Sequence, residues 1–91
     1  MFTCEIETKV NGRSRDLNVD ANGTIISVEE EVSLESLPAV VRAAIEKKAT
    51  QGRVLKVEKA TGNGKVTYEA AISVKGKKSE IQIAEDGTLL K

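Results

Sequence analysis

Two stretches decide the fold: residues 2–27 (FTCEIETKVNGRSRDLNVDANGTIIS) and residues 66–91 (VTYEAAISVKGKKSEIQIAEDGTLLK), which align without a gap 64 residues apart. The identical pairs are Thr3/Thr67, Glu5/Glu69, Val10/Val74, Gly12/Gly76, Gly23/Gly87 and Thr24/Thr88. Two of these pairs are glycines, and each glycine closes a run that is typical of a turn. Glycines in register across an ungapped alignment indicate an internal duplication.

Each copy predicts a three-stranded β-meander. Apolar side chains alternate with polar ones in residues 2–10 and again in residues 66–74, which is typical of a half-buried antiparallel strand. Asn11-Gly12 suits a two-residue turn, and the return strand turns Leu17 and Val19 inward. A turn over residues 20–23 leads to a strand over about 24–30. The second copy repeats this plan and ends on a short strand over residues 88–90.

One helix over about residues 37–50 joins the two copies. Pro38 suits the first helical position, either Ser33 or Ser36 caps the start, and Gly52 suits the residue after the end. The apolar stripe at helical spacing comprises Leu37, Val40, Val41, Ala44, Ile45 and Lys48. A strand over about residues 53–60 follows, and residues 61–64 turn it back into the second copy.

These elements predict an α+β fold, an antiparallel β-sheet with one helix packed on it, in the order β-β-β-α-β-β-β-β. The 91 residues are 40% hydrophobic and 31% charged, which favours one folded domain over residues 1–91. Fourteen basic and 14 acidic residues cancel, which argues against nucleic acid as the partner. No apolar run approaches the roughly 18 residues of a membrane span, and no signal peptide is expected at Met1.

The predicted helix is too small for the predicted sheet. A helix of about 14 residues is roughly 20 Å long and 10 Å wide, whereas seven strands make a sheet more than about 25 Å across. The apolar residues of the first copy that lack a lid are Phe2, Cys4, Ile6, Leu17, Val19, Ile26 and Val28. Three solutions are open: the sheet curls around the helix, two chains cover each other, or a helix precedes Met1 in the natural protein.

Several segments resemble the PepSY-like family, which is related in fold to the β-lactamase inhibitor protein. The segments are Leu37-Pro38-Ala39-Val40, Ala43-Ala44-Ile45, Val54-Leu55-Lys56-Val57-Glu58-Lys59, Tyr68-Glu69 and Asp86-Gly87. The resemblance covers about residues 34–91. It implies a helix packed on an antiparallel sheet, a periplasmic or secreted location, and binding or inhibition of a protein such as a peptidase. Ala84 departs from the family pattern, which usually has Asp there.

The sequence predicts no catalytic, cofactor-binding or metal-binding residue, and no enzyme activity. There is no histidine, the commonest general base and metal ligand. We expect Cys4 to be a small buried hydrophobic residue, and residues 29–31 (three glutamates) to be a solvated stretch rather than a cation site. The lysines of residues 75–78 are expected to protect a hairpin from edge pairing.

Two functions fit these observations. The first is a non-enzymatic module that binds an unidentified protein or peptide, in the manner of an inhibitor, through the open sheet face or an edge strand. The alternative is a structural or self-association domain, whose sheet is completed by a second chain, giving a homodimer. Neither function needs a cofactor, nucleic acid or insertion into a membrane.

Overall fold

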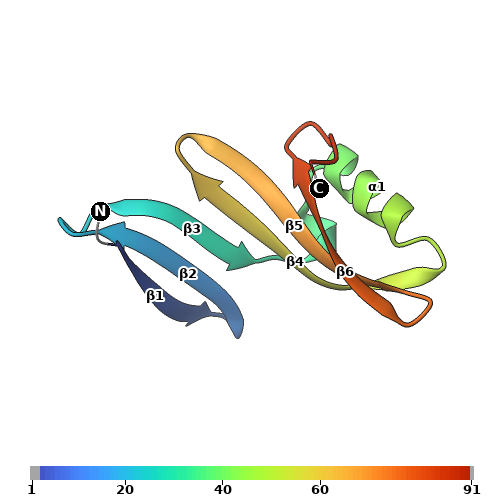
Figure 1. The fold of residues 1–91 in the computed structure, drawn as a ribbon, viewed down its shortest axis with the longest axis horizontal. Helices are drawn as coiled ribbons and strands as arrows, with labels where there is room; N and C mark the ends of the chain where they lie inside the picture. Colours follow the sequence, from blue (N-terminus) through green and yellow to red (C-terminus); the bar gives the residue numbers. More distant parts are fainter. Residues whose placement is uncertain (1–2, 91) are drawn as a thin grey trace.

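The computed structural model describes residues 3–90 and confirms the predicted fold class (Figure 1). Six antiparallel strands form one sheet in sequence order. They are β1 (Thr3–Val10), β2 (Arg13–Asp20), β3 (Ile25–Glu31), β4 (Gly52–Gly62), β5 (Lys65–Val74) and β6 (Lys77–Ala84). A 3-10 turn, η1 (Leu34–Ser36), and the helix α1 (Ala39–Lys48) connect β3 to β4. The last predicted strand is reduced to one bridge between Ile83 and Leu89.

The two meanders have the same pairing 64 residues apart. Val10 pairs with Arg13, and Val74 pairs with Lys77; in both cases the turn residues have positive φ, 53° and 80° in the first copy and 54° and 80° in the second. The next turn repeats as well, because the bridge between Val19 and Ile25 recurs between Ile83 and Leu89. We therefore call residues 64 apart equivalent. Their origin by duplication stays an interpretation.

The helix is shorter than predicted and begins differently. Pro38 is not the first helical residue but the residue before it, and its carbonyl oxygen accepts hydrogen bonds from the amides of Val41 and Arg42 at 3.0 Å each. The predicted cap by Ser33 or Ser36 is wrong, since neither the 3-10 turn nor the helix has a side-chain cap. Gln51, not Gly52, takes the left-handed conformation after the helix, with φ at 65°.

Gly52 is required for a different reason than the one predicted. It begins β4, and a Cβ atom at this position would overlap the carbonyl oxygen of Ser73 on β5. A glycine therefore lets the two strands approach at the point where the chain leaves the helix and enters the sheet.

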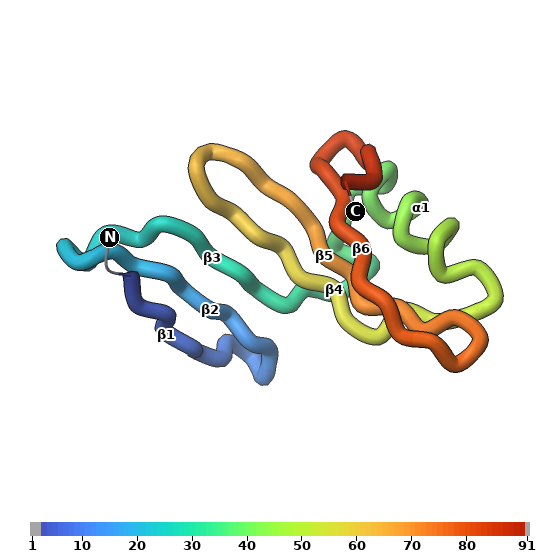
Figure 2. The backbone as a smooth tube through the Cα atoms, viewed as in Figure 1, coloured from blue at the N-terminus to red at the C-terminus, as the bar shows by residue number. Residues whose placement is uncertain are grey.

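The hydrophobic core lies at one end of the molecule. Among the described residues, the buried apolar side chains are Leu37, Val41, Ile45, Ala49, Val57, Tyr68, Ala70, Ile72, Ile81 and Ile83. None of them belongs to β1, β2 or β3. Figure 2 shows α1 and the first meander at opposite ends of the long axis, and the molecule measures 46 × 26 × 23 Å. Its radius of gyration is 14.2 Å, against about 12 Å for a compact domain of this length.

The sheet does not curl around its single helix. The first meander joins the rest of the sheet through β3, whose residues 27–31 pair with residues 58–62 of β4. Val41 and Ile45 of α1 are fully buried, and the sheet residues that share their core all lie on β4, β5 and β6. Curling, one of the three solutions considered, is therefore wrong for this chain. The predicted inward position of Phe2 lies outside the described residues.

Candidate functional site: the open half of the sheet face

One face of the sheet is covered at one end and bare at the other. Paired residues of an antiparallel sheet lie on the same face. The pairings therefore show which residues of β1–β3 lie on the face that α1 covers over β4–β6. We call this the helix face. Its apolar residues on the first meander are Cys4, Ile6, Val10, Leu17, Val19, Ile25 and Val28. We call this group the open half, since no helix of residues 3–90 lies over it (Figure 1).

Equivalent positions show how much the missing cover matters. In the second meander, Ile81 is 9% exposed and Ile83 is 0% exposed. Their equivalents in the first meander, Leu17 and Val19, are only partly buried. Ile6 is 42% exposed, whereas its equivalent Ala70 is 1% exposed. The open half is thus an apolar surface on a backbone equivalent to that of the second meander, but no helix covers it to form a core.

Cys4 belongs to this surface, which corrects the prediction that it is buried. The structure leaves it exposed as a free thiol on β1, opposite Val19 on β2. Its equivalent is Tyr68, which is buried, with 5% of its surface exposed. The alternation in the sequence identified the correct face for Cys4, and only the absence of a covering helix changed its exposure.

The two outer strands of the sheet differ in how they are protected. β6 carries Lys77 and Lys78 beside the hairpin tip, and near its end the amide of Leu90 donates to the carbonyl oxygen of Gln82 at 2.7 Å. β1 pairs only with β2 among the described residues, over eight residue pairs. Its outer backbone groups can therefore accept a further strand, which is a common way of binding an extended peptide.

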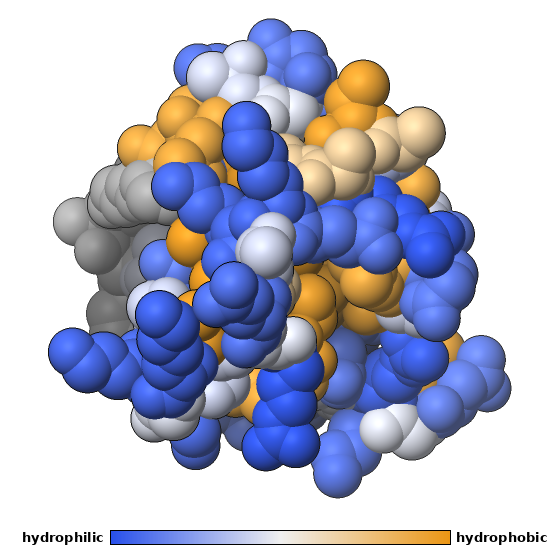
Figure 3. Space-filling view, turned by 90° about the vertical axis from the view of Figure 1, so that its right-hand side faces the viewer, coloured by the Kyte–Doolittle hydropathy of each residue, from blue (hydrophilic) through white to orange (hydrophobic). Residues whose placement is uncertain are grey.

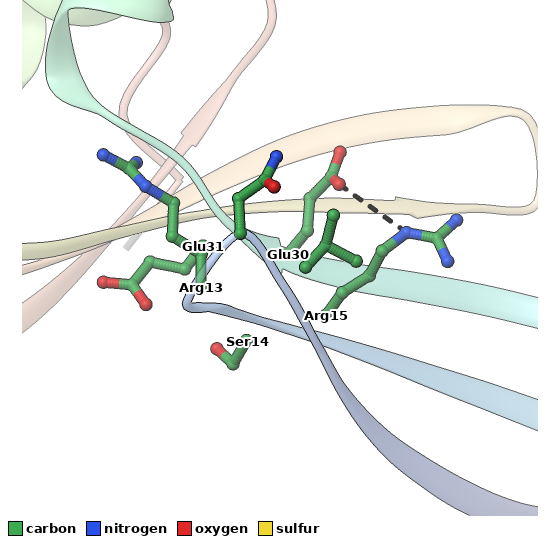
Figure 4. A pocket seen from close by; sticks show the side chains of 7 residues that line it. Arg13, Ser14, Arg15, Glu30 and Glu31 are labelled. Carbon is green, nitrogen blue, oxygen red and sulfur yellow. Dashed lines mark ion pairs between the residues drawn. The ribbon is translucent and has the colours of Figure 1, made fainter.

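A hollow of about 460 Å³ lies at the end of the open half, where β2 meets β3. Arg13 and Arg15 of β2 and Glu30 and Glu31 of β3 line it, and the Nε atom of Arg15 lies 3.7 Å from an Oε atom of Glu30 (Figure 4). Both side chains of this ion pair are about 40% exposed, so it contributes little to stability. Its guanidinium and carboxylate groups are available to pair with polar groups of a partner.

The opposite face of the sheet carries two rows of carboxylates. One row crosses the first three strands through Glu7, Asp16 and Glu29, and the other crosses β3, β4 and β5 through Glu31, Glu58 and Glu69. Burial raises the pKa of Glu58; the charge of Lys56 lowers it, and neighbouring carboxylates raise it further. Neither row was predicted, because the acidic residues of each row are far apart in the sequence and only strand pairing brings them together.

The three consecutive glutamates do not point to the same side of the sheet. Strand alternation turns Glu30 to the helix face, where it meets Arg15, and turns Glu29 and Glu31 to the other face. Within residues 3–90 there is no group of three acidic or cysteine side chains placed to hold a metal ion. The Asp20 turn is confirmed, since the Asp20 carboxylate accepts hydrogen bonds from the amides of Asn22 and Thr24 at 2.9 and 3.0 Å.

At Ala84 the missing carboxylate is replaced by that of a nearby residue. Ala84 is equivalent to Asp20 and cannot accept those bonds, but the Asp86 carboxylate accepts a hydrogen bond from the Thr88 amide at 2.9 Å. Hydrogen bonds from the side chain and the backbone of Thr88 hold the pKa of Asp86 below its ordinary value. The second turn therefore keeps its shape with a different acid.

The surface at the helix end also exposes apolar side chains, with Val40 52%, Leu89 42% and Leu90 48% exposed. Hydrophilic side chains cover most of it, with apolar patches between them (Figure 3). In the part of the chain that the structure describes, no helix is long and apolar enough to cross a membrane.

Comparison with known proteins gives similar structures but no sequence relatives. No protein-family model matches the sequence, and no curated protein matches it. A DUF2874 family protein from Bacteroides ovatus has a TM-score of 0.81 at 17% identity, with 98% of this chain and 67% of that one covered. A second DUF2874 protein, from Bacteroides uniformis, has a TM-score of 0.80 at 13% identity over 93% and 65%.

A BLIP-like protein from Bacteroides fragilis has a TM-score of 0.76 at 24% identity, with 93% of this chain and 62% of that one covered. BLIP-like refers to the β-lactamase inhibitor protein. The chain thus spans about two thirds of the length of these three solved structures. At these identities the comparison concerns the fold alone, and the chain has the fold of the DUF2874 and BLIP-like structures.

Proposed function

We propose that this domain is a non-enzymatic protein-binding module of the cell envelope, and that it binds its partner through the open half and the adjoining β1 edge. One observation carries the proposal: Ile6, Leu17 and Val19 of the open half are exposed or only partly buried, while their equivalents under α1, Ala70, Ile81 and Ile83, are buried. An apolar surface beside an unprotected strand edge favours association with another polypeptide.

The similar structures support the location and the class of function. One of them, from Bacteroides eggerthii, is described as a candidate periplasmic protein, and another is named after an inhibitor of an enzyme. The PepSY-like resemblance points the same way and adds a finer proposal, membership of that family and inhibition of a peptidase. The open half offers no Trp or Tyr anchor, so its affinity depends on aliphatic contacts and on the strand edge.

The alternative is self-association, and the same surface favours it. Two copies that pair along β1, or pack their open halves together, would bury Ile6 and Val19 without any other partner. The two functions differ in what touches the open half: another protein in the first case, a second copy of this chain in the second.

Cys4 provides a direct test, because it is the single cysteine and is exposed on the open half. A photoactivatable cross-linker attached to Cys4 is irradiated in a native envelope extract. The control carries the label at Glu80→Cys in a Cys4→Ser background, on β6 and on the opposite face of the sheet. We expect the label at Cys4 to form an adduct with a protein other than this chain. The label at the control position should form none.

Competition makes the test specific. Excess unlabelled domain should abolish the adduct, whereas excess Ile6→Lys domain, checked for folding by circular dichroism, should not. Adducts only between copies of this chain would establish the self-association alternative. Identical adducts from both label positions, or an adduct that Ile6→Lys removes equally well, would overturn a binding role for the open half.

A further inference from the structure

We propose that the seam between β3 and β4 is a pH-dependent joint. Carboxylates on its far face, opposite to the helix face, repel one another at neutral pH and let the first meander pivot, and protonation closes the joint. The seam consists of the five residue pairs from Ser27↔Gly62 to Glu31↔Glu58. None of the carboxylates involved belongs to the open half, so the joint does not depend on what covers that half.

The seam is the connection between the two halves of the sheet. Among the described residues, β3 is the one strand of the first meander that pairs with the rest of the sheet (Figure 2). Residues 32–51, which include η1 and α1, connect β3 to β4, so no tight turn closes the seam. The buried side chains of the core within residues 3–90 all lie outside β3. The seam therefore depends on its backbone pairs and on the charges of its own residues.

The two faces of the seam carry opposite kinds of charge pair. On the helix face, Glu30 stands opposite Lys59, and an Oε atom of Glu30 lies 3.7 Å from the Nε atom of Arg15. On the far face, Glu31 stands directly opposite Glu58. Opposite charges across two strands stabilise their pairing, and like charges destabilise it. At neutral pH the helix face of the seam is therefore held together, whereas its far face is pushed apart.

The register brings the side chains of Glu31 and Glu58 close together. The amide of Val32 donates a hydrogen bond to the carbonyl oxygen of Val57 at 3.0 Å, so residues 32 and 57 form a hydrogen-bonded pair. Such pairs alternate along an antiparallel ladder with non-hydrogen-bonded pairs, whose side chains are closer. Glu31 and Glu58 are the next pair along the ladder, and they therefore occupy the closer kind of position.

Charged groups from five strands surround Glu58 on the far face. They are Asp16 on β2, Glu29 and Glu31 on β3, Lys56 on β4, Glu69 on β5 and Glu80 on β6. Lys56 is the one cation of this group, and it lines one hollow with Glu58 and Glu69 and another with Asp16. Its charge therefore offsets part of the repulsion across the seam.

The direction of the pH effect follows from Glu58. Burial is the main cause that raises its pKa, Lys56 lowers it, and the carboxylates of β2 and β3 raise it further. Below the ordinary glutamate pKa, Glu58 is protonated in the folded chain, and the seam is strengthened. That advantage is lost as the pH rises through the raised pKa, because the ionised Glu58 then repels Glu31. The far face opens while the helix face holds, so the first meander bends toward the helix face.

Distance measurements on the intact chain test the movement. Spin labels at Cys4 and at Lys47→Cys, an exposed position on α1, report the separation of the two ends of the molecule by pulsed electron paramagnetic resonance. From pH 7 to pH 4 we expect the mean distance to become longer and the distribution to become narrower. Glu58→Gln should give the acidic distribution already at pH 7. The matched control Glu85→Gln removes an exposed carboxylate from a turn away from the seam, and it should have no effect.

Hydrogen exchange measures the strength of the seam. The protection factor of the Val32 amide, in which the intrinsic pH dependence of exchange is divided out, should be about threefold larger at pH 4 than at pH 7. Glu58→Gln should raise it about twofold at pH 7, and Lys56→Gln should lower it at pH 7 but not at pH 4. The amides of residues 77–84, which lie outside the seam, should show no comparable change.

Three results would overturn the joint. Identical distance distributions at both pH values would show that the two halves do not move, even if the protection of Val32 changes. Equal effects of Glu58→Gln and Glu85→Gln would trace the response to net charge rather than to the seam. A distribution that varies with protein concentration would assign the movement to association between copies. None of these results bears on the Cys4 adduct, so the proposed function is tested separately.

Discussion

The one-sided core predicts that the same substitution has very different costs at the two ends of the helix face. Ile83→Ala removes a side chain that is 0% exposed, in contact with the core under α1. Loss of burial together with the cavity left behind should cost about 3–4 kcal/mol of unfolding free energy. Ile6→Ala removes a side chain that is 42% exposed, and without a cavity it should cost less than about 1 kcal/mol.

Urea unfolding measures both free energies, and Tyr68 supplies the signal. It is the only tyrosine, the chain has no tryptophan, and its ring is 5% exposed in the core, so its fluorescence should change when the core opens. Circular dichroism follows the sheet in parallel, and each titration is run at two protein concentrations. Equal costs at the two positions would refute the reasoning, because they would mean that Ile6 is covered in solution. A cost at Ile6 that grows with protein concentration would identify the cover as a second copy.

Three further predictions test individual features. Burial and neighbouring carboxylates raise the pKa of Glu58, so its protonated form favours folding below the ordinary glutamate pKa and that advantage is lost as the pH rises through the raised value. Glu58→Gln should therefore raise the unfolding free energy at pH 7 by about 0.5 kcal/mol and leave it unchanged at pH 3, and a stabilisation independent of pH would contradict this. Gly52→Ala should lower the unfolding free energy by more than about 2 kcal/mol, because its Cβ would meet the Ser73 carbonyl oxygen. Gly12→Ala has open space around its Cβ and should lower it by only about 1 kcal/mol, because of its positive φ. Equal costs would argue against the close approach at Gly52. Gln51→Gly should stabilise the domain by about 1 kcal/mol in thermal unfolding, since φ at 65° suits glycine, and a loss of stability would be inconsistent with that backbone conformation.

The strands and their pairing could be predicted because short-range chemistry determines them. Asn11-Gly12 and Asn63-Gly64 favour a two-residue turn, and such a turn determines every pair in the hairpin that it closes. Once Val10 pairs with Arg13, counting outward pairs Glu7 with Asp16. Counting therefore finds one pair of each acidic row, Glu7 with Asp16 and Glu58 with Glu69, but not the pair Asp16 and Glu29, because a bulge between Asn18 and Val19 shifts the register of β2 and β3.

Long-range packing could not be predicted in the same way. The sequence showed that one helix is too small for the sheet, but it did not show whether the sheet would curl. That outcome depends on sheet twist and on the five-residue seam between β3 and β4, which hold the first meander away from the helix. The exposure of Cys4 and the hollow beside Arg13 and Glu30 follow from that arrangement, so local patterns do not reveal them.

The composition of the open half is itself an argument for a partner. Relative to the second meander it has Cys4 in place of Tyr68 and Thr8 in place of Ile72, so its apolar volume is smaller. It nevertheless keeps Ile6, Leu17 and Val19, which stand near an unprotected strand edge, an arrangement that promotes aggregation. Polar residues at these positions would preserve every backbone hydrogen bond of β1 and β2 and remove that risk. Aliphatic side chains there are a disadvantage to residues 3–90 in isolation, and they become favourable only when further polypeptide excludes water from them.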